Sequence, residues 1–232
     1  MRRAILSLTL MPLLLMGATS PVIASGLDIR LGAFKPRANS NLFLDDESLY
    51  FVAKDDWVGF TGGAEYNHVL AKNIEVAVHV DGYSKTIDTS YRDWTRPEGG
   101  DIFQTLRLQI VPFGLTLQFV PTGKRTKVAP FLGGGIDLFY YKYEEWGDFI
   151  DFFDPDLTIY SDHFISDGVT FGFHAAGGVR IYLNRDFALV VRGAYQWAEA
   201  DMGGDFSPTE PGLINRLDLS GASVTFGVHL RF

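Results

Sequence analysis

The sequence predicts an all-β fold, an eight-stranded antiparallel up-and-down transmembrane β-barrel, on three observations. Apolar and polar residues alternate with a period of two through most of the chain after residue 25, as in strands with two different faces. The connections between these segments are short and long in turn. No apolar stretch after residue 25 is long enough for a transmembrane helix, so the chain can span a membrane only as a closed barrel.

Residues 1–24 predict a secretory signal peptide that is not part of the fold. Arg2 and Arg3 form its basic start, residues 5–16 are mainly apolar, and we expect cleavage after Ala24. Residues 25–232 then form one barrel domain, without cysteine for a disulfide or a lipid anchor. The net charge of −8 argues against a nucleic-acid partner.

Eight segments have the alternation and the length, about 9 residues or more, of a tilted membrane-crossing strand. They are residues 26–35, 57–69, 74–88, 101–120, 127–143, 167–183, 186–200 and 217–232. The short connections are 70–73, 121–126 and 183–186, and the long ones are 36–56, 89–100, 144–166 and 201–216. An even number of strands with short turns at one end and long loops at the other is typical of bacterial outer-membrane barrels.

The fourth segment changes the face that holds its apolar residues. These stand at even positions before Pro112 and at odd positions after it, as Leu106, Leu108, Ile110, Leu115, Leu117 and Phe119. Because a one-residue slip turns every side chain to the other face, we expect a β-bulge at residues 111–113, where proline has no N–H to lose from the ladder. The alternative is two separate elements, which would break the count of eight strands.

Alternation alone does not decide whether the apolar face points into the barrel or out of it. A soluble periplasmic ligand-binding barrel would turn that face inward. Three observations favour the membrane arrangement: the polar face mixes acidic and basic residues with glycines and could fill a narrow lumen with paired charges, the connections at the two ends differ markedly in length, and aromatic residues stand near strand ends, where the bilayer interface favours them. These aromatic residues are Tyr140, Phe187, Tyr195, Trp197 and Phe232.

Two segments support a family resemblance, APFLGGGIDLFYY at 129–141 and the terminal SVTFGVHLRF at 223–232. Together with the signal peptide and the eight strands, they resemble the eight-stranded outer-membrane β-barrel protein family of Gram-negative bacteria, of the OmpA transmembrane-domain and OmpW kind. The resemblance implies the cell outer membrane, with its lipid around a barrel that we expect to be a monomer. It also implies an assembly signal for the barrel-assembly machinery, formed by Phe226, Val228, Leu230 and Phe232.

The polar face predicts a network of paired charges in the lumen. Unpaired charges inside a membrane barrel are costly, so we expect carboxylates and guanidinium groups to pair there. The expected members are Glu65, Glu75, Asp81, Arg107, Asp137, Arg180, Arg192 and Arg231. Eight strands leave an interior that side chains about fill, which favours a plug over a narrow polar conduit.

The histidines have no spacing typical of metal ligands, so the sequence predicts no metal, no cofactor and no catalytic residue. His174 and His229 are expected to form hydrogen bonds in the lumen. The third long connection, 144–166, is either a solvated loop or a binding patch of acidic and aromatic residues, although its spacing is not that of a calcium-binding EF-hand. The candidate patch is Trp146, Asp148, Asp151, Phe152, Phe153, Asp154 and Asp156.

The predicted function is non-enzymatic: envelope integrity, contact with ligands or surfaces through the acidic loops, or passage of small solutes. A lipid A-modifying outer-membrane enzyme is the alternative, and it needs a serine and a histidine, or a comparable pair, within about 3 Å on a lipid-accessible wall. The third reading is the soluble periplasmic ligand-binding barrel.

Overall fold

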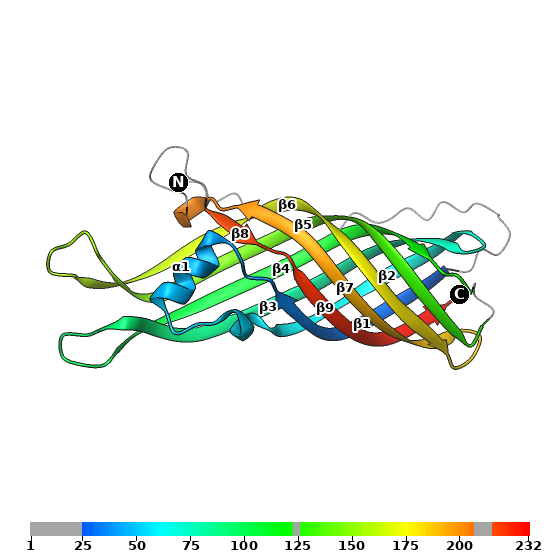
Figure 1. The fold of residues 1–232 in the computed structure, drawn as a ribbon, viewed down its shortest axis with the longest axis horizontal. Helices are drawn as coiled ribbons and strands as arrows, with labels where there is room; N and C mark the ends of the chain where they lie inside the picture. The colour runs from blue at the N-terminus through cyan, green and yellow to red at the C-terminus, as the bar shows by residue number, and fades with distance from the viewer. Residues whose placement is uncertain (1–24, 123–125, 207–214) are drawn as a thin grey trace.

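The computed structural model describes residues 25–122, 126–206 and 215–232, so the predicted signal peptide lies outside the described residues. Nine strands form one antiparallel sheet, and eight of them make a barrel wall (Figure 1). The wall consists of β1 (Ser25–Pro36), β2 (Gly59–Ala71), β3 (Ile74–Thr95), β4 (Asp101–Phe119), β5 (Val128–Ile150), β6 (Ile159–Tyr182), β7 (Phe187–Asp201) and β9 (Gly221–Arg231). The predicted eight-stranded up-and-down barrel is confirmed.

The ring closes between the first and the last strand. β9 pairs with β7 on one side and with β1 on the other, from Gly26↔Arg231 to Pro36↔Gly221. The backbone N–H groups of Ser25 and Phe232 each donate to the carbonyl oxygen of the other residue at 3.0 Å. The last residue of the chain is therefore part of the wall.

At the end of the barrel opposite the chain termini, several strands are longer than predicted. β3 runs to Thr95, and the β5–β6 ladder continues to the pair Ile150↔Ile159. The predicted loops 89–100 and 144–166 are therefore wrong, because most of their residues form two hairpins that project beyond the barrel (Figure 1). Aromatic pairs across β5 and β6, such as Phe149 and Phe164 with ring centroids 4.6 Å apart, stabilise this extension.

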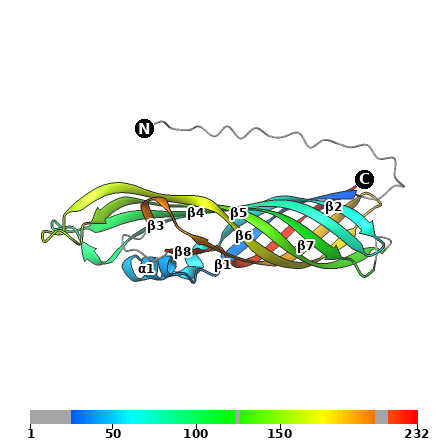
Figure 2. The same ribbon diagram turned by 90° about the horizontal axis from the view of Figure 1, so that it is seen from above.

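Shorter elements cover one side of the extension. The first long connection holds α1 (Asn41–Leu49) and the 3₁₀ turn η1 (Lys54–Trp57), and the last one holds η2 (Gly204–Phe206) and β8 (Arg216–Asp218), which pairs with β7. α1 lies alongside β8 (Figure 2), where Phe43 packs edge-on against Trp57 at 5.4 Å between ring centroids. No helix among the described residues is long and apolar enough to cross a membrane.

The polarity of the inward and outward side chains is reversed between the two halves of the barrel. In the half that carries the chain termini, outward side chains are apolar and exposed, from Val111 to Phe119 on β4 and from Leu132 to Tyr140 on β5. We call this outward apolar surface the lipid band. Inside it the lumen is mainly polar, with Thr116 buried on β4, and a small apolar cluster that includes Phe131 and Val190 lies towards the short turns. In the projecting half the interior is an apolar core instead, which includes Leu106, Leu108, Ile110, Phe139, Tyr143 and the α1 residues Leu42 and Phe43.

This change of surroundings corrects the expected β-bulge at Pro112. β4 pairs in one register with β5 from Gln104↔Gly147 to Phe119↔Leu132, and its even-numbered residues point inward throughout. Leu108 is apolar because it enters the core of the projecting half, and Leu115 is apolar because it faces lipid. The apolar residues change faces while the backbone does not.

A charge placed on β4 is expected to mark the edge of the lipid band. Leu115→Arg puts a guanidinium among outward apolar side chains and should lower the free energy of unfolding by about 2–4 kcal/mol, whereas Thr105→Arg, on the same face beyond the band, should lower it by at most about 1 kcal/mol. Urea unfolding of protein refolded into lipid vesicles measures both variants. Equal losses would contradict the assignment of the band.

Candidate functional site

A buried ion-pair network fills the lumen within the lipid band. Its centre is Arg30 of β1, which donates to Glu65 of β2 at 2.8 Å and to Asp81 of β3 at 3.2 Å. The side chains of Arg30 and Glu65 are completely buried. Gln118 of β4 donates to the other oxygen of Glu65 at 2.6 Å, and Arg192 of β7 lies 4.0 Å from Glu65. Five strands therefore meet at one carboxylate–guanidinium pair.

A second guanidinium group organises the lumen nearer the chain termini. Arg180 of β6 donates to Glu75 at 2.8 Å and lies 3.5 Å from Asp28. Its planar group is 4.8 Å from the ring centroid of Phe131. His229 of β9 pairs with Asp28. Each charge of this group thus has an opposite charge beside it, as burial in a membrane barrel requires.

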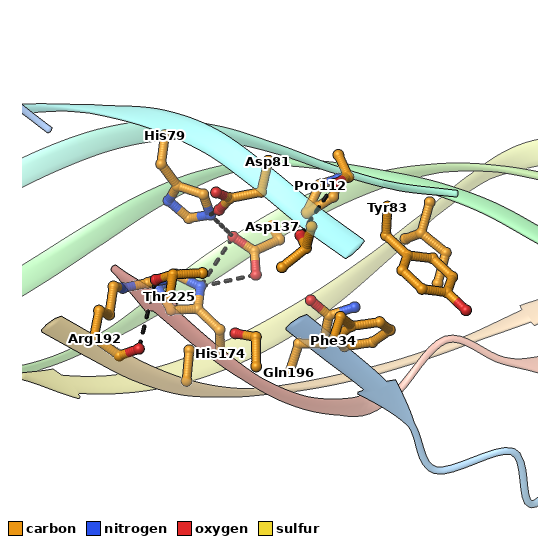
Figure 3. Close-up of a pocket in the computed structure, with 15 residues that line it drawn as sticks. Phe34, His79, Asp81, Tyr83, Pro112, Asp137, His174, Arg192, Gln196 and Thr225 are labelled. Carbon is orange, nitrogen blue, oxygen red and sulfur yellow. Dashed lines mark hydrogen bonds and ion pairs between the residues drawn. The ribbon is translucent and has the colours of Figure 1, made fainter. Parts of the chain in front are cut away.

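Two histidines and an aspartate form a third group, towards the projecting half. His79 Nε2 of β3 lies 3.3 Å from Asp137 Oδ1 of β5, and His174 Nδ1 of β6 lies 2.8 Å from Asp137 Oδ2 (Figure 3). The hydroxyl oxygen of Thr116 lies 3.3 Å from His79 Nδ1 and 2.9 Å from His174 Nε2. All four side chains are buried. The three ligand-type groups lie close enough to hold one metal ion.

Gly114 of β4 leaves the space that this group occupies. A Cβ added to Gly114 would overlap the carboxylate of Asp137 and the ring of His79. A cavity of about 30 Å³ lies beside the group and is lined by both histidines, Asp137 and Arg192. That space is about the size of one or two water molecules.

The structure locates each of the eight residues that were expected in the lumen. Six lie inside the wall with the partners given above: Glu65, Glu75, Asp81, Asp137, Arg180 and Arg192. Arg231 shares the inward face of β9 with His229, at the end of the strand. The expectation for Arg107 is wrong, because the odd-numbered residues of β4 point outward and its side chain is 41% exposed.

Asp28 and Arg30 were missing from that expectation, although they belong to the network. A signal for them exists in the sequence, because they alternate with Leu27, Ile29 and Leu31. Arg107 instead borders an outward pocket of about 730 Å³ that lies beyond the lipid band and is lined also by Trp146 and His163. Its guanidinium carbon lies 5.6 Å from the Trp146 ring centroid, and its Nη1 lies 3.6 Å from Glu144.

The seven residues of the expected patch in 144–166 do not gather in one place. Trp146 and Asp148 both line the outward pocket, and Asp148 also pairs with Arg96 of the neighbouring hairpin. The other five lie in the turn 151–158, where Asp151 accepts a hydrogen bond from the backbone N–H of Phe153 at 2.9 Å. Phe153 itself is fully exposed.

A buried acidic group joins α1 to the wall beyond the lipid band. Tyr143 Oη of β5 donates to Asp46 Oδ2 of α1 at 2.7 Å. Burial, followed by the charge of Glu145, raises the pKa of Asp46 well above its ordinary value. Burial also raises the pKa of Glu145 to about 7. Uncharged carboxyl groups thus hold α1 against β5 below neutral pH.

One serine–histidine pair lies on the outer face of the wall, at the chain termini. Ser25 Oγ is 3.2 Å from His68 Nδ1, and Tyr66 Oη donates to the same Ser25 oxygen at 3.0 Å. Among the described residues, no carboxylate forms a hydrogen bond with the His68 ring. An activated serine usually has such a third group to orient its base.

Comparison with protein-family models and with curated proteins finds no match. Among solved structures, the outer membrane protein OprG from Pseudomonas aeruginosa is 13% identical, with 90% of this chain and 96% of that chain covered and a TM-score of 0.55. Neisserial surface protein A is 14% identical, with 90% of this chain and 97% of that chain covered and a TM-score of 0.49. Outer membrane protein W of E. coli is 19% identical, with 90% of this chain and 99% of that chain covered and a TM-score of 0.38. The likeness to OprG is one of fold, that of an outer-membrane β-barrel.

The attachment of α1 is expected to weaken as pH rises. The pKa of Glu145 is about 7 in the folded protein and ordinarily 4.5, so the stabilisation is fully present below about pH 4.5 and is lost as pH rises through about 7. Hydrogen exchange of α1, corrected for the intrinsic rate, should accelerate over this range. Glu145→Gln should reduce the pH dependence and leave the part due to Asp46, and Glu47→Gln, on the same helix, should leave the profile unchanged. A wild-type profile that does not change with pH would contradict this account.

Proposed function

We propose that this chain is a non-enzymatic protein of the bacterial outer membrane, sealed along its axis, which acts through the part that projects from the membrane. The observation that supports this most is the lumen within the lipid band. Arg30, Glu65, Arg180 and Glu75 occupy it with buried ion pairs, and a cavity beside His79, Asp137 and His174 has a volume of about 30 Å³. A plug of this kind favours anchoring over conduction.

The outward surface supports the membrane location. Large apolar side chains are exposed on neighbouring strands at one level, and water would disfavour a continuous belt of this kind. A closed ring with a polar lumen and a lipid-facing exterior is the arrangement of outer-membrane barrels. The alternate apolar residues up to Phe232, expected as the assembly signal, agree with delivery by the barrel-assembly machinery.

We infer that the working surface lies outside the cell, on the two hairpins. In barrels of this kind the short turns face the periplasm, so the β3–β4 and β5–β6 hairpins project outward. Trp94 and Phe152 pack edge-on between the two hairpins at 5.6 Å between ring centroids. The exposed Phe153 stands among Asp151, Asp154 and Asp156. This surface suits a partner that offers both cationic and apolar groups.

Passage of small solutes through the wall is a second candidate, supported by one observation. β3 and β4 keep their register on both sides of Pro112, but Asp81 and Gly82 have no paired residues opposite them on β4. The gap lies beside the small lumen cavity, which Asp81, Gly82 and Pro112 all line. An enzymatic role is favoured less, because the Ser25–His68 pair lacks an orienting carboxylate among the described residues.

Conductance measurements test the sealed lumen. The wild-type protein in planar bilayers should give no discrete current steps. Arg180→Ala or Arg192→Ala removes a blocking side chain and leaves carboxylates facing the lumen, so brief steps should appear. Arg107→Ala, which changes the outer face, should remain silent. Discrete steps in the wild type would retire the plug and favour the conduit.

A binding measurement tests the projecting surface. Proteoliposomes with the wild-type protein should adhere to a surface coated with quaternary ammonium and alkyl groups. Phe152→Ser combined with Phe153→Ser should reduce adhesion about tenfold, the factor that corresponds to about 1.4 kcal/mol. Val58→Ser, on an exposed apolar residue away from the tip, is the control. Equal adhesion of all three proteins would contradict a role for the hairpin tip.

A further inference from the structure

We infer that His79, Asp137 and His174 form a binding site for one divalent transition-metal ion of the zinc class, inside the barrel. Nothing in the anchoring function requires such a site, and the proposal stands independently of it. Imidazole and carboxylate together are a ligand set suited to zinc and its neighbours in the first transition row.

The spacing of the ligand atoms is close to what a tetrahedral ion needs. Bonds of about 2.0–2.1 Å at tetrahedral angles place neighbouring ligand atoms about 3.3 Å apart. His79 Nε2 and Asp137 Oδ1 are 3.3 Å apart, and all three ligand atoms lie within 4.8 Å of one another. His174 Nδ1 lies 2.9 Å from the same oxygen, Asp137 Oδ1, and this distance must widen by about 0.4 Å, a small side-chain rotation.

Thr116 holds the two rings in the orientation that a metal ion requires. Its oxygen is within hydrogen-bond distance of His79 Nδ1 and His174 Nε2, the ring nitrogens turned away from Asp137. Histidines that bind metals almost always donate their second ring N–H to a carboxylate, a backbone carbonyl or a water, and the Thr116 hydroxyl occupies that position here. A hydroxyl oxygen has two lone pairs and can accept from both rings at once.

The protons can be arranged so that a cation fits between the rings and the carboxylate. If both neutral rings donate to Thr116, a nitrogen lone pair of each ring faces the carboxylate of Asp137. A divalent metal ion at that point would bind both nitrogens and the carboxylate.

The charges beside the site are compatible with a cation. The carboxylates of Asp81 and Asp137 and the guanidinium group of Arg192 line the small cavity next to the two histidines. Asp81 Oδ2 lies 3.9 Å from His79 Nε2, on the side of the small cavity that leaves space for a water ligand.

Metal analysis of the refolded protein tests this site. The protein is refolded in detergent with Zn²⁺ or Co²⁺, passed through a desalting column, and assayed for bound metal and for the visible spectrum of Co²⁺. The wild type should retain about one equivalent, with a spectrum typical of a tetrahedral site. His79→Gln and His174→Gln should retain almost none, and Thr116→Val should bind Zn²⁺ about 10–100-fold more weakly.

Two controls keep the result interpretable. His163→Gln removes a histidine from the outer wall, and His229→Gln removes a lumen histidine paired with a different carboxylate; both should keep the full equivalent. Heat-modifiable gel migration identifies variants that have not folded, and Thr116→Val, a nearly isosteric change, then decides. Less than about 0.1 equivalent in the wild type, or equal losses in His163→Gln and His79→Gln, would overturn the proposal.

Discussion

The completely buried Arg30–Glu65 ion pair stabilises the membrane half of the barrel because charged or amide side chains of five strands interact there. Removal of one partner of such a pair leaves an uncompensated charge and typically costs about 3–5 kcal/mol. Asp81, Gln118 and Arg192 are placed by their contacts with this pair. The His79–Asp137–His174 group then occupies the space that remains between these groups and the apolar core.

The same hydrogen-bonded wall passes through two regions that differ in what lies inside and outside it. Within the lipid band it has lipid outside and paired charges inside, and beyond the band it has water outside and an apolar core inside. β4 crosses this boundary near Pro112 without a change of register. The apolar residues of the alternating pattern therefore point inward on one side of the boundary, as Leu108 does, and outward on the other side, as Leu115 does.

The sequence was sufficient for the eight strands of the wall, their order and most of the lumen charges, because a period of two survives in each of them. It was not sufficient for β8, since the predicted segment 217–232 is divided into β8 and β9. The sequence could not predict which face of β4 carries Arg107, or that β4 has no bulge, because both depend on whether lipid, water or the core surrounds each residue. α1 was missed because its nine residues, NLFLDDESL, are too few to display helical periodicity. His79, Asp137 and His174 lie 37 or more residues apart, so only the closed ring brings them to one level.

The length of β5 and β6 determines what can touch this protein in a living envelope. The ten residues from 141 to 150 continue beyond the lipid band, and at about 3.3 Å per residue along a tilted strand they rise about 25 Å above it. A cell-surface sugar layer of similar depth would bury a short loop but not this stalk. Steric access to the tip would then depend on the length of the neighbouring polysaccharide chains, so that changes in the envelope could mask or unmask Phe153 without any change in the protein itself.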